Sequence, residues 1–382
     1  MASTIKVTNI NTPDGTGSIT ADRPLAGDGN ALVGISPRNY IIDGDFTQWP
    51  GGTSATTTVN GSYGLPALWD NHNGGTGTGT WERSTDVPTV AQSGHQSAYS
   101  MLIKCTGTAA SVAAGASYGF RYYVTGSDFA HISQQQVTLS FWAKTAAANS
   151  GDTYSFSFRN SANDRTYVHD FSPTSSWTKF THTFTLDTSG TWLDTEADKG
   201  LLINLGLAVG SNFQDSAETW QAGLGMGTSS TSNFTDNTGN EFYISQFGLY
   251  LGGSAPTFTS PPISTVKDQI DYYVQRYDFD SVSDEIVATG HLWTTTDTHG
   301  VGSLRREMRT AGTATITSGG SAWQINYDSS HTNMSASLSI VSIGKNTFKF
   351  SGAQSAVGVQ GENVIIKRQG TGTASYMLDA RH

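Results

Sequence analysis

The chain has 382 residues and a formal net charge of −10, from 31 acidic and 21 basic side chains. Charged residues make up only 14% of it, whereas aromatic residues reach 11% and glycine occurs 43 times. Disordered chains are rich in charge and poor in aromatic residues, so this composition predicts a folded protein. An acidic chain lacks the basic surface that neutralises phosphates, which argues against nucleic acid as a partner.

The sequence gives no indication of secretion, membrane insertion or disulfide bonding. Its single cysteine, Cys105, cannot form an internal disulfide, and the strand-like residues 99–105 predict a buried, unreactive thiol. The longest apolar stretch, residues 200–210, is too short to cross a bilayer and fits a buried strand. Residues 1–20 lack the apolar core of a signal peptide. At this length we expect two domains.

Residues 1–37 differ from the rest because they contain few large apolar side chains and many turn formers. Pro-Asp-Gly at 13–15 and Gly-Asp-Gly at 27–29 are turn signals. Such a segment cannot bury enough surface to fold alone. We therefore expect an extended N-terminal arm that is held by sister subunits, by a partner protein or by the chain's own domains.

Residues 38–251 have the pattern of an all-β domain. Short stretches with apolar cores or period-two alternation are separated by Ser, Thr, Asn and Gly loops, and this spacing predicts a jelly roll or β-sandwich. The clearest expected strands are residues 137–143, 154–158, 180–186, 200–209 and 241–251.

A linker and a second domain are predicted after this region. Residues 252–263 contain two glycines and three prolines, which is typical of a linker. The segment that follows predicts a helix N-capped by Ser264. Its apolar stripe comprises Val266, Ile270, Tyr273, Val274 and Tyr277. Strand patterns then return, clearest at 337–343 and 363–367, so residues 264–382 predict a helix and a smaller C-terminal β-sandwich.

No pattern in the sequence indicates catalysis. It has no Gly-x-Ser-x-Gly elbow, phosphate loop or dinucleotide fingerprint. The nine histidines are scattered, and Asp194, Glu196 and Asp198 lack the glycine and distal glutamate of a calcium loop. We therefore expect no catalytic residues, no metal and no cofactor, although the sequence leaves open a carboxylate pair for glycoside hydrolysis.

The tryptophans are the strongest candidates for binding residues. Trp49, Trp69 and Trp81 lie in loop-rich sequence near the start of the β region, and Trp192 and Trp220 lie in later loops. Sugar binding uses flat aromatic faces beside amide and carboxylate groups, and such sites are built from loops on a rigid scaffold. The alternative is that each tryptophan covers the edge of the core.

Five segments in a shared order resemble one family of proteins. Residues 39–53 (NYIIDGDFTQWPGGT) resemble the opening strand of carbohydrate-binding-like domains in bacteriophage tail-fibre and related virion proteins. Residues 139–144 and 242–258 are similar to the central and closing strands of such domains. Residues 272–277 (YYVQRY) and 306–315 resemble the helix and the segment that follow them.

The resemblance has a further match and two departures. The N-terminal arm is similar to the N-termini of some marine phage structural proteins. Pro50 follows the tryptophan of the first motif, and Leu-Trp-Asp stands at 68–70 where the family tends to have Asp-Arg-Trp. The family supplies no defined set of ligand residues. Our own candidates are Trp69 and Trp81 as stacking residues, with Asp70, Asn71 and Tyr63 as polar neighbours.

The resemblance implies a non-enzymatic virion protein. It favours a homotrimeric tail fibre, a receptor-binding protein that attaches to host surface glycans and contacts other virion proteins through residues 1–37. The alternative is a capsid decoration or head-fibre protein whose arm grips the capsid. A polysaccharide depolymerase is less favoured, because such spikes are long parallel β-helices and no fixed repeat is visible.

Overall fold

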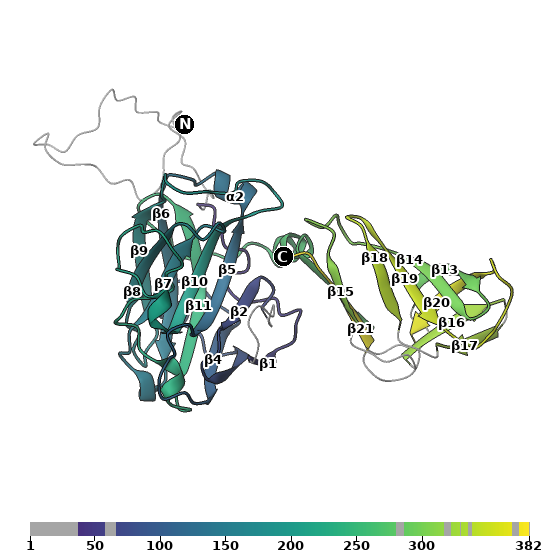
Figure 1. Ribbon diagram of the computed structural model, residues 1–382, viewed down its shortest axis with the longest axis horizontal. Coiled ribbons are helices and arrows are strands. Elements are labelled where there is room, and N and C mark those ends of the chain that lie inside the picture. Colours follow the sequence, from purple (N-terminus) through teal and green to yellow (C-terminus); the bar gives the residue numbers. More distant parts are fainter. Residues whose placement is uncertain are drawn as a thin grey trace, which may run out of the picture. The chain divides into compact units, whose positions relative to one another are not determined.

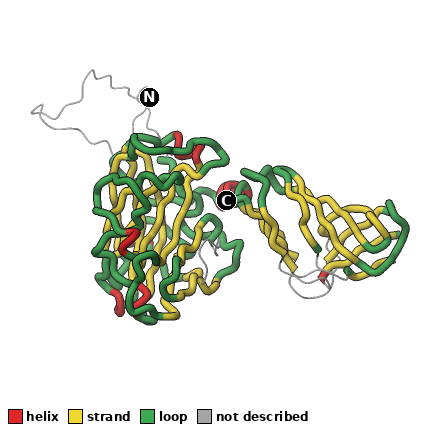
Figure 2. The backbone as a smooth tube through the Cα atoms, viewed as in Figure 1, coloured by secondary structure: helices red, strands yellow, loops and turns green. Residues whose placement is uncertain are grey.

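The computed structural model describes residues 37–57, 66–279, 286–316, 322–328, 330–334, 338–368 and 374–381. The described residues from Asn39 onward belong to one compact unit, Asn39–His382. The expected N-terminal arm lies outside the described residues apart from its last position. This unit consists mainly of antiparallel strands (Figures 1 and 2).

Two sheets form a β-sandwich in the first part of this unit. In spatial order, the six-stranded sheet contains β1 (Ser54–Thr57), β3 (Thr78–Ser84), β4 (Ser100–Gly107), β11 (Glu241–Leu251), β6 (Gln136–Thr145) and β9 (Thr178–Thr185). The five-stranded sheet contains β2 (Trp69–Asn73), β5 (Ser117–Thr125), β10 (Lys199–Val209), β7 (Tyr154–Arg159) and β8 (Thr166–Phe171).

The core between these sheets is aromatic. Alternate residues of each strand point inward, and Phe141 of β6 packs edge-to-face on Phe156 of β7, with ring centroids 4.8 Å apart. Phe247 of β11 joins both rings. Each of the five strands expected in residues 38–251 coincides with or overlaps an observed strand. Cys105 is buried on β4, as expected, and burial raises the pKa of its thiol.

A few short helices interrupt the strands. They are α1 (Val90–Ser93), α2 (Gly126–Ala130), α3 (Ile263–Asp271) and the 3₁₀ turns η1 (Ala147–Asn149), η2 (Ser211–Phe213) and η3 (Phe234–Asp236). Among the described residues, no helix is long and apolar enough to cross a membrane.

Helix α3 is shorter than the sequence predicts. Val266 and Ile270 are buried as expected. Val274 and Tyr277 lie instead in the next strand. The N-cap residue of α3 is Pro262, whose side chain forms no capping hydrogen bond. The expected helix beyond Asp271 is therefore wrong: the chain pairs with the C-terminal strand, with Val274 opposite Asp379.

The last part of the chain has its own core and two sheets. The three-stranded sheet contains β12 (Val274–Phe279), β21 (Ala374–Asp379) and β15 (Thr313–Ile316). The seven-stranded sheet contains β17 (Ser330–Asn333), β16 (Trp323–Tyr327), β20 (Asn363–Arg368), β13 (Ile286–Thr294), β14 (Asp297–Ser303), β19 (Thr347–Ala353) and β18 (Ser339–Ile343). Trp323, Phe350 and Leu378 are fully buried in this core.

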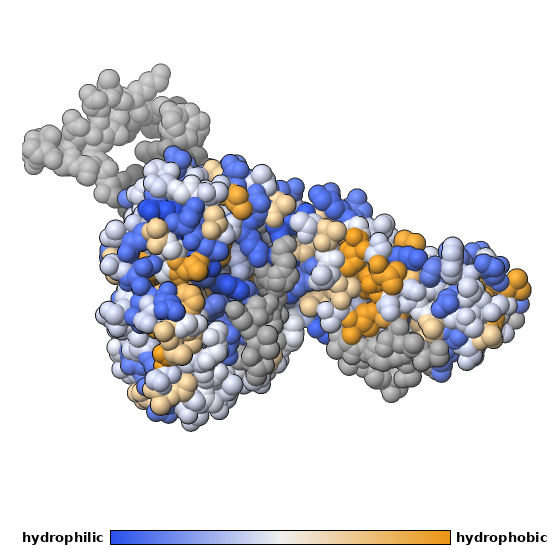
Figure 3. All heavy atoms as spheres, in the orientation of Figure 1, coloured by the Kyte–Doolittle hydropathy of each residue, from blue (hydrophilic) through white to orange (hydrophobic). Residues whose placement is uncertain are grey.

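The predicted fold class, mainly β with a short helix, is confirmed. On the face drawn in Figure 3, hydrophilic side chains cover most of the described surface, and hydrophobic side chains gather in small groups.

Candidate functional site

Trp69 and Trp81 lie in strands and are buried, each only 1% exposed. The ring of Trp69 contacts Phe120 and Tyr122, with centroids 5.0 Å away in both cases. Trp81 packs edge-on against Phe120. A ring that stacks on a sugar needs a face open to solvent. The prediction that these two tryptophans stack on a sugar is therefore wrong, because both rings belong to the core.

Their predicted polar neighbours do not form an exposed group. Asp70 is buried on the outward side of β2, where its Oδ2 accepts a hydrogen bond from Nε of Arg121 at 2.7 Å. Asn71 is 1% exposed. Both are therefore contradicted as surface ligands of a sugar beside Trp69. Tyr63 lies outside the described residues.

The sandwich brings a different set of polar and aromatic side chains together, at the edge where β8 and β9 lie. These strands are consecutive in the chain but are the edge strands of opposite sheets. Their inward-facing residues meet in pairs: Tyr167 stacks on Phe184 with ring centroids 5.0 Å apart. His169 stacks on His182 at 3.6 Å and an interplanar angle of 14°. Two histidines therefore occupy positions that elsewhere hold core aromatics.

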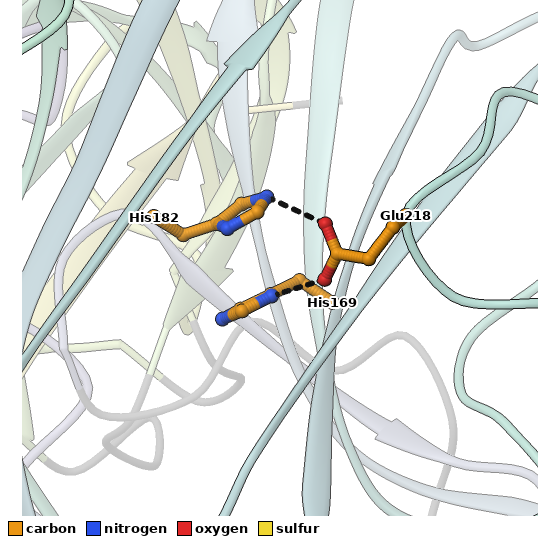
Figure 4. Close-up of side chains that lie close together, drawn as sticks. All are labelled: His169, His182 and Glu218. Atoms are coloured by element: carbon orange, nitrogen blue, oxygen red, sulfur yellow. Dashed lines mark hydrogen bonds and ion pairs between the residues drawn. The ribbon is translucent and has the colours of Figure 1, made fainter.

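Glu218 reaches this pair of histidines from the loop between β10 and β11. The loop adds to the free edge of β8, where the Glu218 N–H donates to the Val168 carbonyl at 2.8 Å. Glu218 adopts a left-handed backbone conformation, with φ of 63°. Its Oε1 lies 2.7 Å from Nδ1 of His169, and its Oε2 lies 3.4 Å from Nε2 of His182 (Figure 4). The Tyr167 hydroxyl donates to Oε2 at 2.5 Å. We call Tyr167, His169, His182 and Glu218 the edge cluster.

The surroundings perturb the titration of the edge cluster. Burial and, to a smaller extent, the neighbouring His169 lower the pKa of His182 to about 4, although Glu218 acts in the opposite direction. Burial alone would raise the pKa of Glu218, but hydrogen bonds from Tyr167 and His169 outweigh it, so the pKa lies below its usual value. At neutral pH the cluster therefore contains an ionised carboxylate and a neutral His182 imidazole.

Two loop tryptophans lie near the edge cluster: Trp220 contacts it, and Trp192 contacts Trp220. Trp220 lies over Tyr167, with centroids 5.4 Å apart, and its indole N–H donates to the Thr185 carbonyl at 2.8 Å. Trp192 stacks on buried Phe129 at 4.9 Å. The two indoles are 5.7 Å apart and nearly perpendicular, at 80°. Both are half-buried, and we call the pair the tryptophan corner.

The sequence contains only part of the signal for this site. Trp192 and Trp220 are already candidates because they fall in loops. His169 and His182 each occupy the apolar phase of an alternating strand, as in residues 180–186 (FTHTFTL), which places them inward. Nothing in the sequence indicates that Glu218 lies beside them.

A second polar group lies on the outer face of the five-stranded sheet. Arg159 is only 8% exposed, and its Nε has no hydrogen-bond partner in the described part of the chain. Burial and the neighbouring Arg121 lower its pKa to about 10. The Lys199 ammonium lies 4.3 Å from the ring centroid of Tyr123, so it covers one face of that ring. That face of the Tyr123 ring is therefore not open to a ligand.

No protein-family model and no curated protein matches the chain. Solved structures do match, and carbohydrate-binding modules are among them. A candidate sugar-binding protein from Bacteroides thetaiotaomicron is 15% identical over 56% of this chain and 100% of that one, with a TM-score of 0.33.

Two further matches cover a similar share of the chain. A xylan-binding domain from Paenibacillus barcinonensis is 11% identical over 58% of this chain and 98% of that one, with a TM-score of 0.28. The enzymatically active domain of tailspike protein 4 from bacteriophage CBA120 is 12% identical over 56% of this chain and 21% of that one, with a TM-score of 0.29. At these TM-scores the likeness carries no argument about function.

Proposed function

We propose that the first β-sandwich binds a glycan at the tryptophan corner. The observation that carries this proposal is the pair of half-buried indoles of Trp192 and Trp220, set at 80° and 5.7 Å apart. Apolar faces of pyranose rings pack on such surfaces. Glu218 lies two residues from Trp220, and half of its side chain is exposed, so its carboxylate can accept hydrogen bonds from sugar hydroxyls.

The scaffold around the corner supports a binding role. Each indole N–H already donates to a backbone carbonyl, Trp192 to Ser189 at 2.7 Å and Trp220 to Thr185 at 2.8 Å. These bonds fix the rings before a ligand arrives, which lowers the entropic cost of binding. The loops themselves are held by a rigid two-sheet core.

Loss of glycan binding in a double variant tests this proposal. Trp192→Ala with Trp220→Ala should weaken binding to a glycan identified by array screening by roughly tenfold or more, since each stacked ring contributes on the order of 1 kcal/mol. Trp177→Ala is the matched control. Trp177 is also half-buried, but its indole N–H donates to Asp86 in the loop between β3 and β4. Trp220→Phe should keep part of the affinity. Unchanged binding by the folded double variant would contradict the site.

We further propose that the protein is a virion component, a trimeric tail fibre or receptor-binding protein without enzymatic activity, located in the tail fibre or on the capsid surface. The order of the motifs in residues 38–382 that resemble phage fibre proteins supports this role. A capsid decoration or head-fibre protein anchored by residues 1–37 is the second candidate. Antibody-gold labelling of intact particles separates the two: label at fibre tips supports attachment, and label over the head supports decoration. Unlabelled particles would contradict both.

A further inference from the structure

The edge cluster has the composition of a transition-metal site. Two imidazoles and one carboxylate offer one ligand atom each, and these atoms all lie within 4.8 Å of one another. It is the one group of three potential ligands that converges in this way in the described part of the chain. Imidazole and carboxylate are the ligands from which proteins build sites for zinc and similar divalent metals.

The distances are close to those that coordination requires. Zinc binds imidazole nitrogen at about 2.0–2.1 Å and carboxylate oxygen at about 2.0–2.2 Å, so a nitrogen and an oxygen bound to one ion lie at most about 4.3 Å apart. Glu218 already holds its two oxygens 2.7 Å from Nδ1 of His169 and 3.4 Å from Nε2 of His182 (Figure 4). The stacked rings have nearly parallel planes, so both must rotate for their lone pairs to converge on one ion.

The charge and access of the cluster also suit a cation. The Glu218 carboxylate lies beside both imidazoles, and no lysine or arginine of the described residues pairs with it. Half of the Glu218 side chain is exposed, as are 20% of His169 and 13% of His182. An ion can therefore enter from solvent, and it would find an anionic ligand that no permanent cation neutralises.

Tyr167 supplies the outer support that metal ligands usually have. Its hydroxyl donates to Oε2 of Glu218 at 2.5 Å and lies 3.1 Å from Nε2 of His182. Hydrogen bonds of this kind orient a ligating carboxylate before the ion binds. The backbone hydrogen bond from the Glu218 N–H to the Val168 carbonyl, at 2.8 Å, also holds Glu218 in place.

We propose that His169, His182 and Glu218 bind one divalent transition metal ion of the zinc type per chain, at the edge between the two sheets. Three protein ligands leave a fourth position for water or another oxygen ligand. The proposal does not depend on sugar binding at the tryptophan corner.

Titration of the metal-stripped full chain with Zn²⁺ alone tests the site. Calorimetry should show one ion per chain for the wild type. Glu218→Gln and His182→Ala should each weaken binding by about tenfold to a hundredfold or more. His131→Ala is the control, because His131 is exposed and lies outside the edge cluster, and it should bind like the wild type. Zn²⁺ should raise the melting temperature of the wild type and the control but not of His169→Ala.

Spectroscopy keeps the test independent of stability. X-ray absorption of the zinc-loaded chain should show nitrogen and oxygen ligands only, whereas sulfur would indicate Cys105 instead. Trp192→Ala should weaken glycan binding and leave zinc binding unchanged, because the Trp192 ring packs on Phe129 and Trp220, so that failure of the sugar site and failure of the metal site can be told apart. Absence of Zn²⁺ binding by the wild type would overturn the proposal. Wild-type affinity for Zn²⁺ in the folded Glu218→Gln and His182→Ala variants would also overturn it.

Discussion

His72 lies on the outward side of β2, and its environment excludes the charged form of its ring. Its Nε2 is hydrogen-bonded to the Ser117 hydroxyl, and its Nδ1 has no partner among the described residues. Burial, with a smaller effect of Arg121 and Arg159, lowers the pKa of His72 to about 3. The unfolded chain, with a His pKa near 6.5, binds this proton first as the pH falls. His72 should therefore destabilise the fold below pH 6.5.

Replacement of His72 by Gln isolates this effect. Relative to the variant, the wild type should lose free energy of unfolding between pH 6.5 and 4, by at most about 1.4 kcal/mol per pH unit. Asp43 has the opposite effect on the pH dependence of stability, because burial raises its pKa to about 7. Its contribution to the free energy of unfolding is therefore lost as the pH rises from about 4 to 7. Asp43 is present in both chains and cancels. Denaturant unfolding at several pH values measures the difference, and a pH-independent difference would contradict the prediction.

At this scale the sequence predicts some environments and not others. Cys105 is correctly predicted as buried because its neighbours form a clear strand. Trp69 is wrongly predicted as a loop residue, because the polar side chains of Asp70 and Asn71 hide the strand. The period of two explains the error: Trp69 faces the core, while Asp70 points outward to Arg121. A tryptophan next to polar residues is therefore no evidence of an exposed ring.

The turn between α2 and β6 contains an element-scale test. Gln134 is exposed and adopts a left-handed conformation with φ of 63°, which is unfavourable for a residue with a Cβ atom. Gln134→Gly should raise the free energy of unfolding by about 0.5–1 kcal/mol. Gln135→Gly is the control, because Gln135 has no positive φ and its side chain donates to the His131 carbonyl. The control should have a lower free energy of unfolding than the wild type. If denaturant unfolding shows Gln134→Gly to be less stable than Gln135→Gly, the prediction is refuted.

Strands were easier to predict than the helix, for a physical reason. Alternation of inward and outward residues predicts strands such as β7 and β9 from local sequence alone. The apolar stripe from Val266 to Tyr277 also fits a helix, but Tyr272, Tyr273 and Val274 are residues that favour strands. Pairing of β12 with β21, far away in the sequence, decides the outcome. The periodicity of the local sequence does not indicate that β21 will pair with this segment.

At the scale of the whole molecule, the candidate site combines segments that are distant in sequence. The edge cluster takes two histidines from strands of opposite sheets and Glu218 from a loop that follows β10. Strand patterns predict a sandwich, but they do not predict which edge strands adjoin or which loop covers them. Composition and strand patterns indicate the fold class, whereas the site becomes visible only in three dimensions.

The assembly state is the remaining expectation at this scale. Residues 1–37 have too few large apolar side chains to form a core, so exchange of arms between subunits would supply their partners. Three linked sugar sites would also raise avidity without a new contact. Light scattering during gel filtration should give three times the chain mass of 40.6 kDa, and a chain of residues 38–382 should be monomeric. A monomeric full-length chain would contradict the trimer, while a trimer without the arm would place the subunit interface on the β domains.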